Sequence, residues 1–130
     1  KEHFRSLQIA YQTAPFFEFF EDKIRSLYQR KYSYLIDLNL ACFHIVQDLM
    51  ELHISYETTQ NYQLENKDYL DYRNLSGAKR KPVFDLEKYD QVFMEKHGFL
   101  KNLSILDLIF NLGNESTAYL KIHSRKQVEH

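Results

Sequence analysis

Apolar residues recur every three or four positions in the first third of the chain, which predicts helices over residues 3–13, 15–30 and 34–52. Pro15 separates the first two helices, since proline ends a helix or occupies its first turn. Ser33 is the predicted N-cap of the third. The apolar stripes are Phe4, Leu7 and Tyr11; Phe16, Phe17, Phe20, Ile24, Leu27 and Tyr28; and Leu35, Leu38, Cys42, Ile45, Leu49 and Leu52.

The period then changes, because residues 53–58 alternate between apolar and polar side chains and so predict a β-strand. A single strand cannot satisfy its own backbone, so it should pair with residues 89–93, with a second copy of itself, or with a segment outside the chain. Residues 89–93 are predicted to form a short strand or one helical turn. A short helix over 68–75 and a loop over 77–82 are expected in the polar segment between them.

The densest helix start and stop signals lie nearer the C-terminus. Ser104 precedes an apolar run and carries Asp107 three residues later, which resembles a capping box. Gly113 supplies a residue type that commonly ends a helix. Ser116 is the predicted cap of a further short helix over 117–122.

These elements predict a mainly α fold with one or two short β-strands. We expect residues 1–123 to form a single helical domain and residues 124–130 to form a frayed C-terminal tail. The sequence has no initiator Met and enters helical periodicity almost at once. We therefore expect it to be the C-terminal part of a larger α/β fold.

The composition argues against nucleic acid and membranes as general partners. A chain of 130 residues with 44% hydrophobic residues is long enough for one domain with a core. The net charge of −1 gives no general attraction to nucleic acid or to an anionic membrane. The apolar runs are shorter than the roughly 18 residues of a membrane span, so no membrane insertion is expected. The basic run Lys79–Lys81 is best interpreted as a solvated loop, with phosphate contact as its alternative.

Known catalytic motifs do not identify a reaction. The sequence contains no GxGxxG, Walker or GxSxG pattern, and its six histidines form no metal-binding motif, so we expect no metal site and identify no cofactor. His44 and Asp48 are four residues apart on the third predicted helix, a spacing that suits a surface ion pair better than a metal site. The single cysteine, Cys42, excludes an internal disulfide and suits a reducing compartment.

A polar set around the helix that follows Ser104 offers the best candidate chemistry. The set is Asn102, Ser104, Asp107 and Asn111. In one interpretation Ser104 caps the helix and Asp107 accepts backbone amides at its start. In the other, Asp107 and Asn111 line a pocket shared with the first helix, near Arg5 or Tyr11.

Three segments resemble a known family. HFRSLQIAYQTAPFFEFFEDKI (3–24), KYSYLIDLNLACFHIVQDL (31–49) and YDQVF…HGFLKNLSILDLIFNLGNES (within 89–116) are similar to the C-terminal portion of the WbqC-like family, in its Bacteroidetes-type version. The AY…APFF and NLSILDLIFNLG…ES elements are the most specific. Two departures are the absence of the family's N-terminal portion and Asn114 in place of a frequent proline.

The resemblance implies a bacterial cytoplasmic protein with a role in O-antigen or other surface-polysaccharide biosynthesis. A transferase that modifies a glycan with a glycine or another aminoacyl group is the enzymatic form of that role, acting on a sugar-linked small molecule. The catalytic residues stay unknown, because they can lie in the absent portion. The residues with chemistry to offer a ligand are Asn102, Ser104, Asp107, Asn111 and Glu115.

The alternative function is a non-catalytic helical interaction or scaffold module. Phe16, Phe17, Phe19 and Phe20 make the second helix rich in aromatic side chains that could dock a partner. The expected partners are the missing N-terminal portion of the same protein or a second subunit. A Phe19 buried against a neighbouring subunit would favour the module, and a pocket lined by Asp107 and Asn111 would favour the enzyme.

Overall fold

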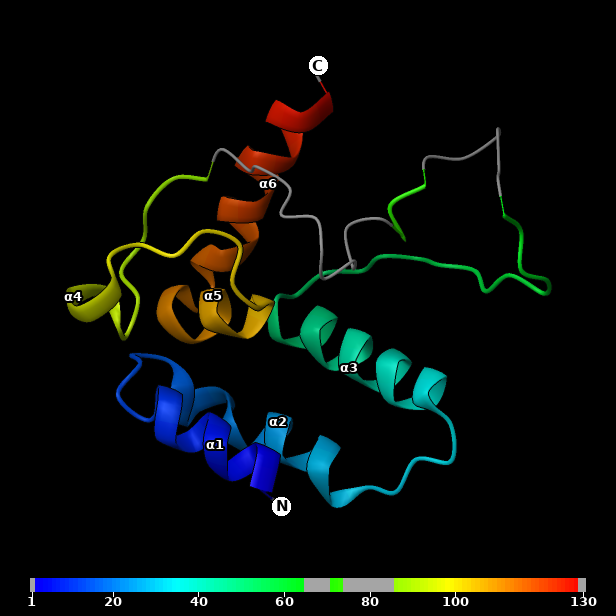
Figure 1. Ribbon diagram of the computed structural model, residues 1–130, viewed down its shortest axis with the longest axis horizontal. Helices are drawn as coiled ribbons and strands as arrows, with labels where there is room; N and C mark the ends of the chain where they lie inside the picture. Colours follow the sequence, from blue (N-terminus) through cyan, green and yellow to red (C-terminus); the bar gives the residue numbers. More distant parts are fainter. Residues whose placement is uncertain (1, 65–70, 74–85, 129–130) are drawn as a thin grey trace.

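A computed structural model describes residues 2–64, 71–73 and 86–128, and these residues form helices and connecting segments without a β-strand. The helices are α1 (Glu2–Tyr11), α2 (Phe17–Gln29), α3 (Leu35–Leu49), α4 (Met94–His97), α5 (Ile105–Leu112) and α6 (Glu115–Val128). Helix α2 packs against α1, α3 and α5, and α5 packs against α6. Figure 1 shows α6 leading away from this group toward the C-terminus. The prediction of a mainly helical fold is confirmed.

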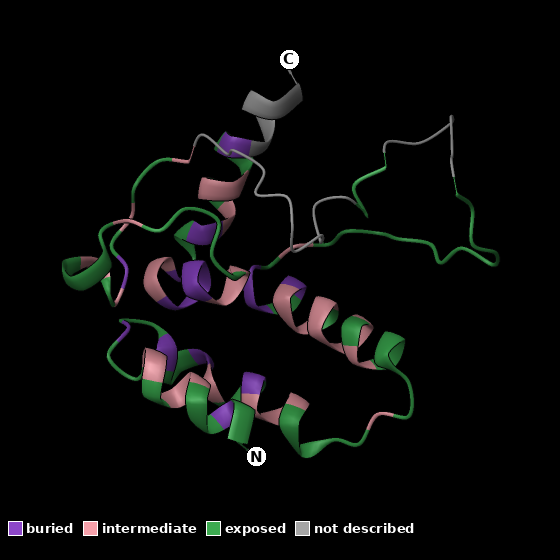
Figure 2. Cartoon of the chain, viewed as in Figure 1, coloured by how far each residue is buried: buried purple, intermediate pink, exposed green. Residues whose placement is uncertain are grey.

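Phe110 lies at the centre of the apolar core. Its side chain is fully buried, and its ring centroid lies 5.2 Å from that of Tyr11 and 5.0 Å from that of Phe17. The Phe16 backbone N–H also donates to the Phe110 carbonyl at 2.9 Å. Figure 2 shows buried residues on α1, α2, α3, α5 and α6. The core residues are Phe4, Ala14, Phe17, Phe20, Ile24, Leu49, Met50, Ile109 and Phe110.

The first three helices form where their apolar stripes predicted them. Helix α1 begins one residue earlier than predicted, and the other ends of the three helices are shorter. The predicted cap Ser33 is wrong, because Tyr34 is the N-cap of α3 and its backbone N–H donates to the Asp37 carboxylate at 3.3 Å. The carboxylate that accepts this capping hydrogen bond thus belongs to the third residue of the helix, Asp37. Helix α3 ends at Leu49 instead of residue 52. Two residues after this end, Glu51 takes a left-handed conformation with φ of 52°.

The strand predicted over 53–58 is not found in the described part of the chain. These residues are exposed and have no ladder to 89–93, where the chain passes through a turn into α4. Their contacts go to α3 instead. The Ile54 N–H donates to Gln47 Oε1 at 2.6 Å, and the Tyr56 hydroxyl bonds to His44 Nε2 at 2.9 Å. The helix predicted over 68–75 lies largely outside the described residues, and the loop over 77–82 lies wholly outside them.

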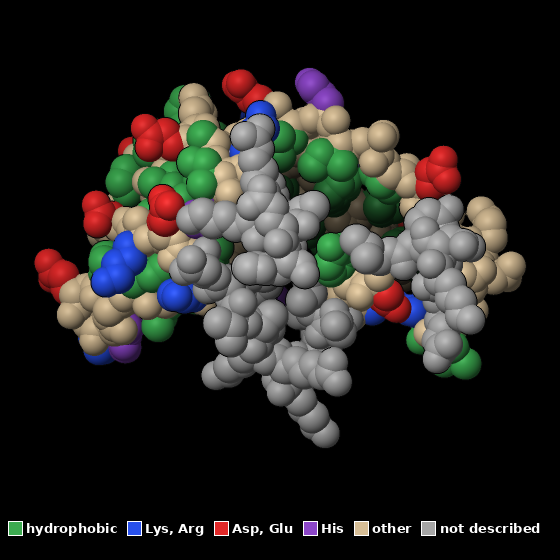
Figure 3. Space-filling model, turned by 90° about the horizontal axis from the view of Figure 1, so that it is seen from above, with side chains coloured by type: hydrophobic (Ala, Val, Ile, Leu, Met, Phe, Trp, Pro, Cys, Tyr) green, Lys and Arg blue, Asp and Glu red, His purple; other side chains and the backbone are tan. Residues whose placement is uncertain are grey.

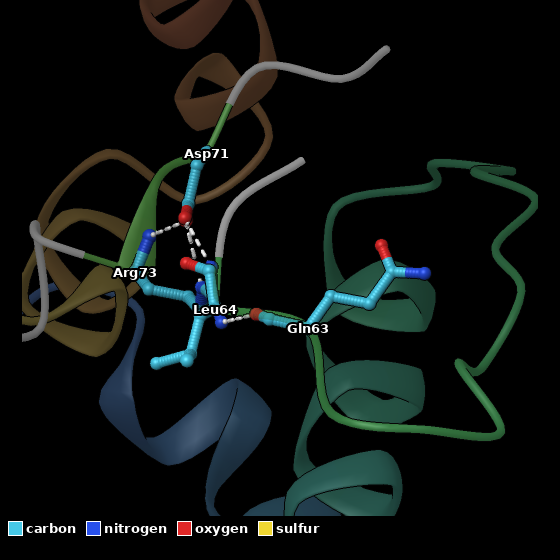
Figure 4. A network of polar contacts seen from close by, with 4 residues as sticks. All are labelled: Gln63, Leu64, Asp71 and Arg73. Atoms are coloured by element: carbon cyan, nitrogen blue, oxygen red, sulfur yellow. Dashed lines mark hydrogen bonds and ion pairs between the residues drawn. The ribbon is translucent and has the colours of Figure 1, made fainter. Parts of the chain in front are cut away.

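Arg73 connects two short described segments, residues 62–64 and residues 71–73. Its guanidinium pairs with Asp71 and donates to the carbonyls of Gln63 at 2.7 Å and Leu64 at 3.2 Å (Figure 4). The hydrogen bonds from Arg73 lower the pKa of Asp71 to about 2. The guanidinium also lies 5.2 Å from the centroid of the Tyr62 ring. One cation therefore holds residues 62–64 against residues 71–73.

Several large apolar side chains stay on the surface. Figure 3 shows apolar side chains gathered on one face, with acidic side chains toward its edge. Phe19 is 79% exposed, Tyr34 72% and Leu35 71%. Among the helices of the described residues, none is both long enough and apolar enough to cross a membrane.

Candidate functional site

Helix α5 begins and ends at the residues that its sequence predicted. Ser104 is the N-cap, and its Oγ accepts a hydrogen bond from the Leu106 N–H at 3.3 Å. Gly113 is the C-cap with φ of 54°, a conformation that glycine adopts without steric cost. These two caps fix the segment that carries the candidate polar residues.

The prediction for Ser116 is wrong. Helix α6 begins at Glu115, so Ser116 lies inside the helix and does not cap it. Ser116 is fully buried and its Oγ donates to the Leu108 carbonyl at 3.2 Å, which joins α6 to α5. The helix was predicted to end at residue 122, but its backbone continues to Val128.

Asp107 is the most deeply placed of the candidate residues, with 3% of its surface exposed. Its Oδ2 accepts hydrogen bonds from the Tyr89 hydroxyl at 2.7 Å and from Gln91 Nε2 at 3.2 Å, and the Tyr11 hydroxyl also bonds to it. Its described donors are thus side chains instead of backbone amides. One carboxylate joins α1, the segment before α4, and α5.

Burial and Asp107 keep two phenols protonated. Burial, the negative charge of Asp107 and the hydrogen bond to it raise the pKa of Tyr11 to about 12. Burial is also the largest cause of the raised pKa of Tyr89, followed by its hydrogen bond to Asp107. At neutral pH both hydroxyls therefore remain donors to the carboxylate.

Gln91 fixes the loop that leads to α5. Its side-chain amide forms two bonds with the Leu100 backbone, one in each direction and both 2.9 Å long. Asn111 donates to the backbone carbonyl of Asp107 at 2.7 Å. These bonds position residues 100–104 beside α5 and α6.

A cavity of about 490 Å³ opens beside α5 and α6, and we call it the α5–α6 cavity. Its lining residues are Leu86, Tyr89, Asn102, Leu103, Ser104, Ile105, Leu108, Tyr119, Leu120 and His123. Asn102 takes a left-handed conformation with φ of 57°, which is uncommon for a residue with a side chain. Tyr89 belongs to the lining and also bonds to Asp107, so it connects the buried network to the cavity.

Aromatic rings form much of one side of the cavity. The Tyr119 ring centroid lies 5.4 Å from that of Tyr89 and 4.4 Å from that of His123. The Tyr119 hydroxyl donates to the Glu87 carbonyl at 2.6 Å, and burial together with the Glu87 charge raises the pKa of Tyr119. None of the ten described lining residues is Lys, Arg, Asp or Glu. Such a lining suits a neutral ligand with apolar faces and a few polar groups.

The structure separates the five predicted ligand residues into different places. Asn102 and Ser104 line the α5–α6 cavity. Asp107 is buried, and Asn111 lines a second hollow, of about 560 Å³, between α5, the turn after α1 and residues 88–92. Glu115 is exposed in the first turn of α6.

Tyr89, Tyr119 and His123 are cavity residues that the sequence did not single out. Tyr119 and His123 are four residues apart, which places them on one face of α6. That signal was present, but the predicted helix ended before His123. No local pattern linked Tyr89 to them.

A third hollow, of about 620 Å³, lies between α2 and α3 and includes His44 and Asp48. His44 is bonded to Tyr56 there. Within the described ranges, no group of three His, Cys, Asp or Glu side chains could hold a metal ion.

Residues 1–85 match the model of the WbqC-like protein family. This match covers more than half of the chain. The chain belongs to the WbqC-like family. The matched residues include α1, α2 and α3, whereas the α5–α6 cavity lies beyond them. No curated protein and no solved structure gives a significant match to the chain.

Proposed function

We propose that this WbqC-like chain binds a neutral sugar unit in the α5–α6 cavity and serves the biosynthesis of O-antigen or another surface polysaccharide in the bacterial cytoplasm. The observation that carries the proposal is the lining of this cavity. The lining combines the aromatic rings of Tyr89 and Tyr119 with the amide of Asn102 and the hydroxyl of Ser104.

This combination matches the two kinds of surface on a sugar. The C–H faces of a pyranose ring are apolar and pack on aromatic and aliphatic side chains, and its hydroxyls bond to amide and hydroxyl groups. A phosphate would be served poorly, because the described lining offers no Lys or Arg. The sugar unit is therefore a better occupant than a sugar phosphate.

The enzymatic form of the proposal is a transferase that adds a glycine or another aminoacyl group to the sugar. The cavity would hold the acceptor sugar for that reaction. Its described lining shows no hydroxyl bonded to a histidine or carboxylate base except Tyr89, which serves Asp107. We therefore assign binding to this cavity and leave the transfer step to other residues of the protein.

A titration of the full chain with methyl β-D-glucoside and with glucose 6-phosphate, followed by NMR, tests the proposal. We expect the neutral glycoside to shift signals of Leu103, Leu108 and Leu120, and to bind more tightly than the phosphate. Absence of saturable shifts at these leucines with any neutral sugar tested would contradict it.

Two leucines supply a matched pair of variants. Leu103 lines the cavity and is 40% exposed, whereas Leu100 is 43% exposed and lies outside the lining. Leu103→Trp should fill the opening and weaken sugar binding by about tenfold or more, a loss of about 1.4 kcal/mol. Leu100→Trp should leave the affinity unchanged.

A second candidate function, a helical interaction module, has support from the surface. Phe19 is 79% exposed and its ring meets the Phe20 ring edge to face, and Leu35 is 71% exposed. Exposed apolar side chains can form a docking site for a second copy or for another part of the same protein. Light scattering over a range of concentrations tests self-association, which Phe19→Ser should abolish under this alternative.

A further inference from the structure

The segment that follows α3 is held to that helix along one side. Residues 53–58 are all exposed, and Figure 1 shows this part of the chain running away from the helices as a long trace without a helical turn. The Ile54 N–H donates to Gln47 Oε1 at 2.6 Å, and the Tyr56 hydroxyl bonds to His44 Nε2 at 2.9 Å. Helix α3 therefore anchors the segment through two of its residues.

The opposite backbone edge of the segment is unpaired. In an extended chain the N–H and C=O groups of successive residues point to opposite edges. Because the Ile54 N–H is directed to α3, the backbone groups of His53, Ser55 and Glu57 lie along the other edge. Among the described residues, the backbone groups of these three have no hydrogen-bond partner. An exposed row of unpaired N–H and C=O groups is a template for a second strand.

The sequence along this edge is complementary to itself. An antiparallel pairing about Ser55 places His53 of one copy opposite Glu57 of the other, and Ile54 opposite Tyr56. The first pair joins an imidazole, which can donate, to a carboxylate, and the second joins an aliphatic to an aromatic side chain. Both kinds of cross-strand pair stabilise a β-ladder. In this register the residues that exchange backbone hydrogen bonds are those on the unpaired edge.

Other registers fit the segment less well. A pairing about Ile54 would place Glu57 opposite Glu51, which has the same charge and takes a left-handed φ of 52° that does not continue a strand. A pairing about Tyr56 would separate Glu57 from His53 of the other copy. A parallel pairing would place each residue beside its own copy, with the two Glu57 carboxylates together.

We infer that residues 53–57 of two copies of this chain pair as an antiparallel β-ribbon with a two-fold axis at Ser55, so that the chain forms a homodimer. Each copy offers the same edge, so the contact is satisfied by two chains and does not extend to a third. A ribbon of this length makes a small interface, which suits a dissociation constant on the order of micromolar. The inference is independent of any sugar in the α5–α6 cavity.

Sedimentation velocity of the full chain tests the dimer. We expect the sedimentation coefficient to rise from the monomer value to the dimer value between about 1 μM and about 500 μM protein. A monomer at every concentration in this range would overturn the inference.

Two variants of Ser55 form a matched pair. Ser55→Pro removes the central N–H and keeps Ile54 extended, so it should weaken the dimer about tenfold or more. Ser55→Ala keeps the N–H and should leave the affinity unchanged. Circular dichroism should show the same helix content in both variants, because the position is exposed. Equal affinities of the two variants would contradict the ladder.

Charge reversal tests the register. Glu57→Lys should weaken the dimer, and His53→Glu combined with Glu57→Lys should restore it, because the pair is rebuilt with its charges exchanged. Phe19→Ser should leave this dimer intact. Self-association that Phe19→Ser abolishes and that the variants at positions 53, 55 and 57 leave unchanged would overturn the inference.

A measurement on the unmodified chain requires no variant. In a mixture of isotope-labelled and unlabelled chains, isotope-filtered NMR detects only contacts between copies. We expect an intermolecular NOE between the Hα atoms of Ile54 and Tyr56, because the Cα atoms of such a non-hydrogen-bonded pair lie about 4.5 Å apart. Intermolecular Hα contacts of Ile54 with Ile54 or of Tyr56 with Tyr56, or none in this segment, would contradict the proposed pairing.

Discussion

Asp107 shows how one residue can join segments that are distant in sequence. Its carboxylate is buried and accepts hydrogen bonds from Tyr89, Gln91 and Tyr11. A buried carboxylate is stable only when such donors replace the water that it has lost. Asp107 therefore contributes to stability by accepting hydrogen bonds from buried donors that would otherwise lack an acceptor.

Asp107→Ala should lower the free energy of unfolding by about 3 kcal/mol or more, because it leaves three partly or fully buried donors without an acceptor. Asp107→Asn keeps an acceptor oxygen and should cost less. Urea unfolding measures both values. Glu95→Ala, at an exposed position of α4, serves as the control. A loss in Asp107→Ala no larger than in the control would show that the network contributes little.

Tyr11 makes stability depend on alkaline pH. Its pKa is about 12 in the folded protein against an ordinary value of 10.0, so the folded state binds the proton more tightly than the unfolded state. This contribution is complete below pH 10 and is lost as the pH rises from 10 to about 12. Ultraviolet titration of tyrosinate should show a late transition near pH 12 whose amplitude falls in Tyr11→Phe and whose midpoint moves to lower pH in Asp107→Asn. A late transition unchanged in both variants would refute this origin.

Among the helices and strands, the sequence predicted those elements whose formation depends on neighbouring residues in the chain. The apolar stripes of α1, α2 and α3 and the two caps of α5 are read within a few residues, and all of these elements form. The strand over 53–58 did not follow from its alternation, because a strand needs a neighbouring backbone and α3 side chains bind this segment instead. Ser116 was misassigned because its buried bond to Leu108 depends on the packing of α6 against α5.

The two glycines that follow helices give a matched test of turn geometry. Gly98 has φ of 68° and no atom within 4 Å of an added Cβ, whereas a Cβ on Gly113 would lie 2.6 Å from the Phe16 ring. Gly98→Ala should cost about 1–2 kcal/mol from backbone strain alone. Gly113→Ala should cost more, since the Phe16 ring must also move. Equal losses in thermal or urea unfolding would contradict the close contact with Phe16.

At the scale of the whole molecule, Phe110 and Phe19 test the placement of the core. Phe110 is fully buried among α1, α2 and α5, whereas Phe19 is 79% exposed. Phe110→Ala should cost about 3–5 kcal/mol, a large share of the roughly 5–15 kcal/mol that stabilises a domain. Phe19→Ala should change the free energy of unfolding little. Similar losses from both would place the core elsewhere.

The sequence predicted only some of the residues of the candidate site. Asn102 and Ser104 were found because a cap and a polar set are local patterns, and both line the cavity. Tyr89 and His123 come to the same cavity through the bonds of Tyr89 to Asp107 and of His123 to Glu87, which link positions 18 and 36 residues apart. Contacts of that range are set by tertiary packing, which one sequence does not display.

We propose that this WbqC-like chain holds a sugar in the α5–α6 cavity. The most direct measurement is a set of intermolecular NOEs between methyl β-D-glucoside and the isotope-labelled full chain. We expect NOEs from the sugar to the Tyr119 ring and to the methyl groups of Leu108 and Leu120. NOEs confined to the hollow between α2 and α3, or none at saturating sugar, would contradict it.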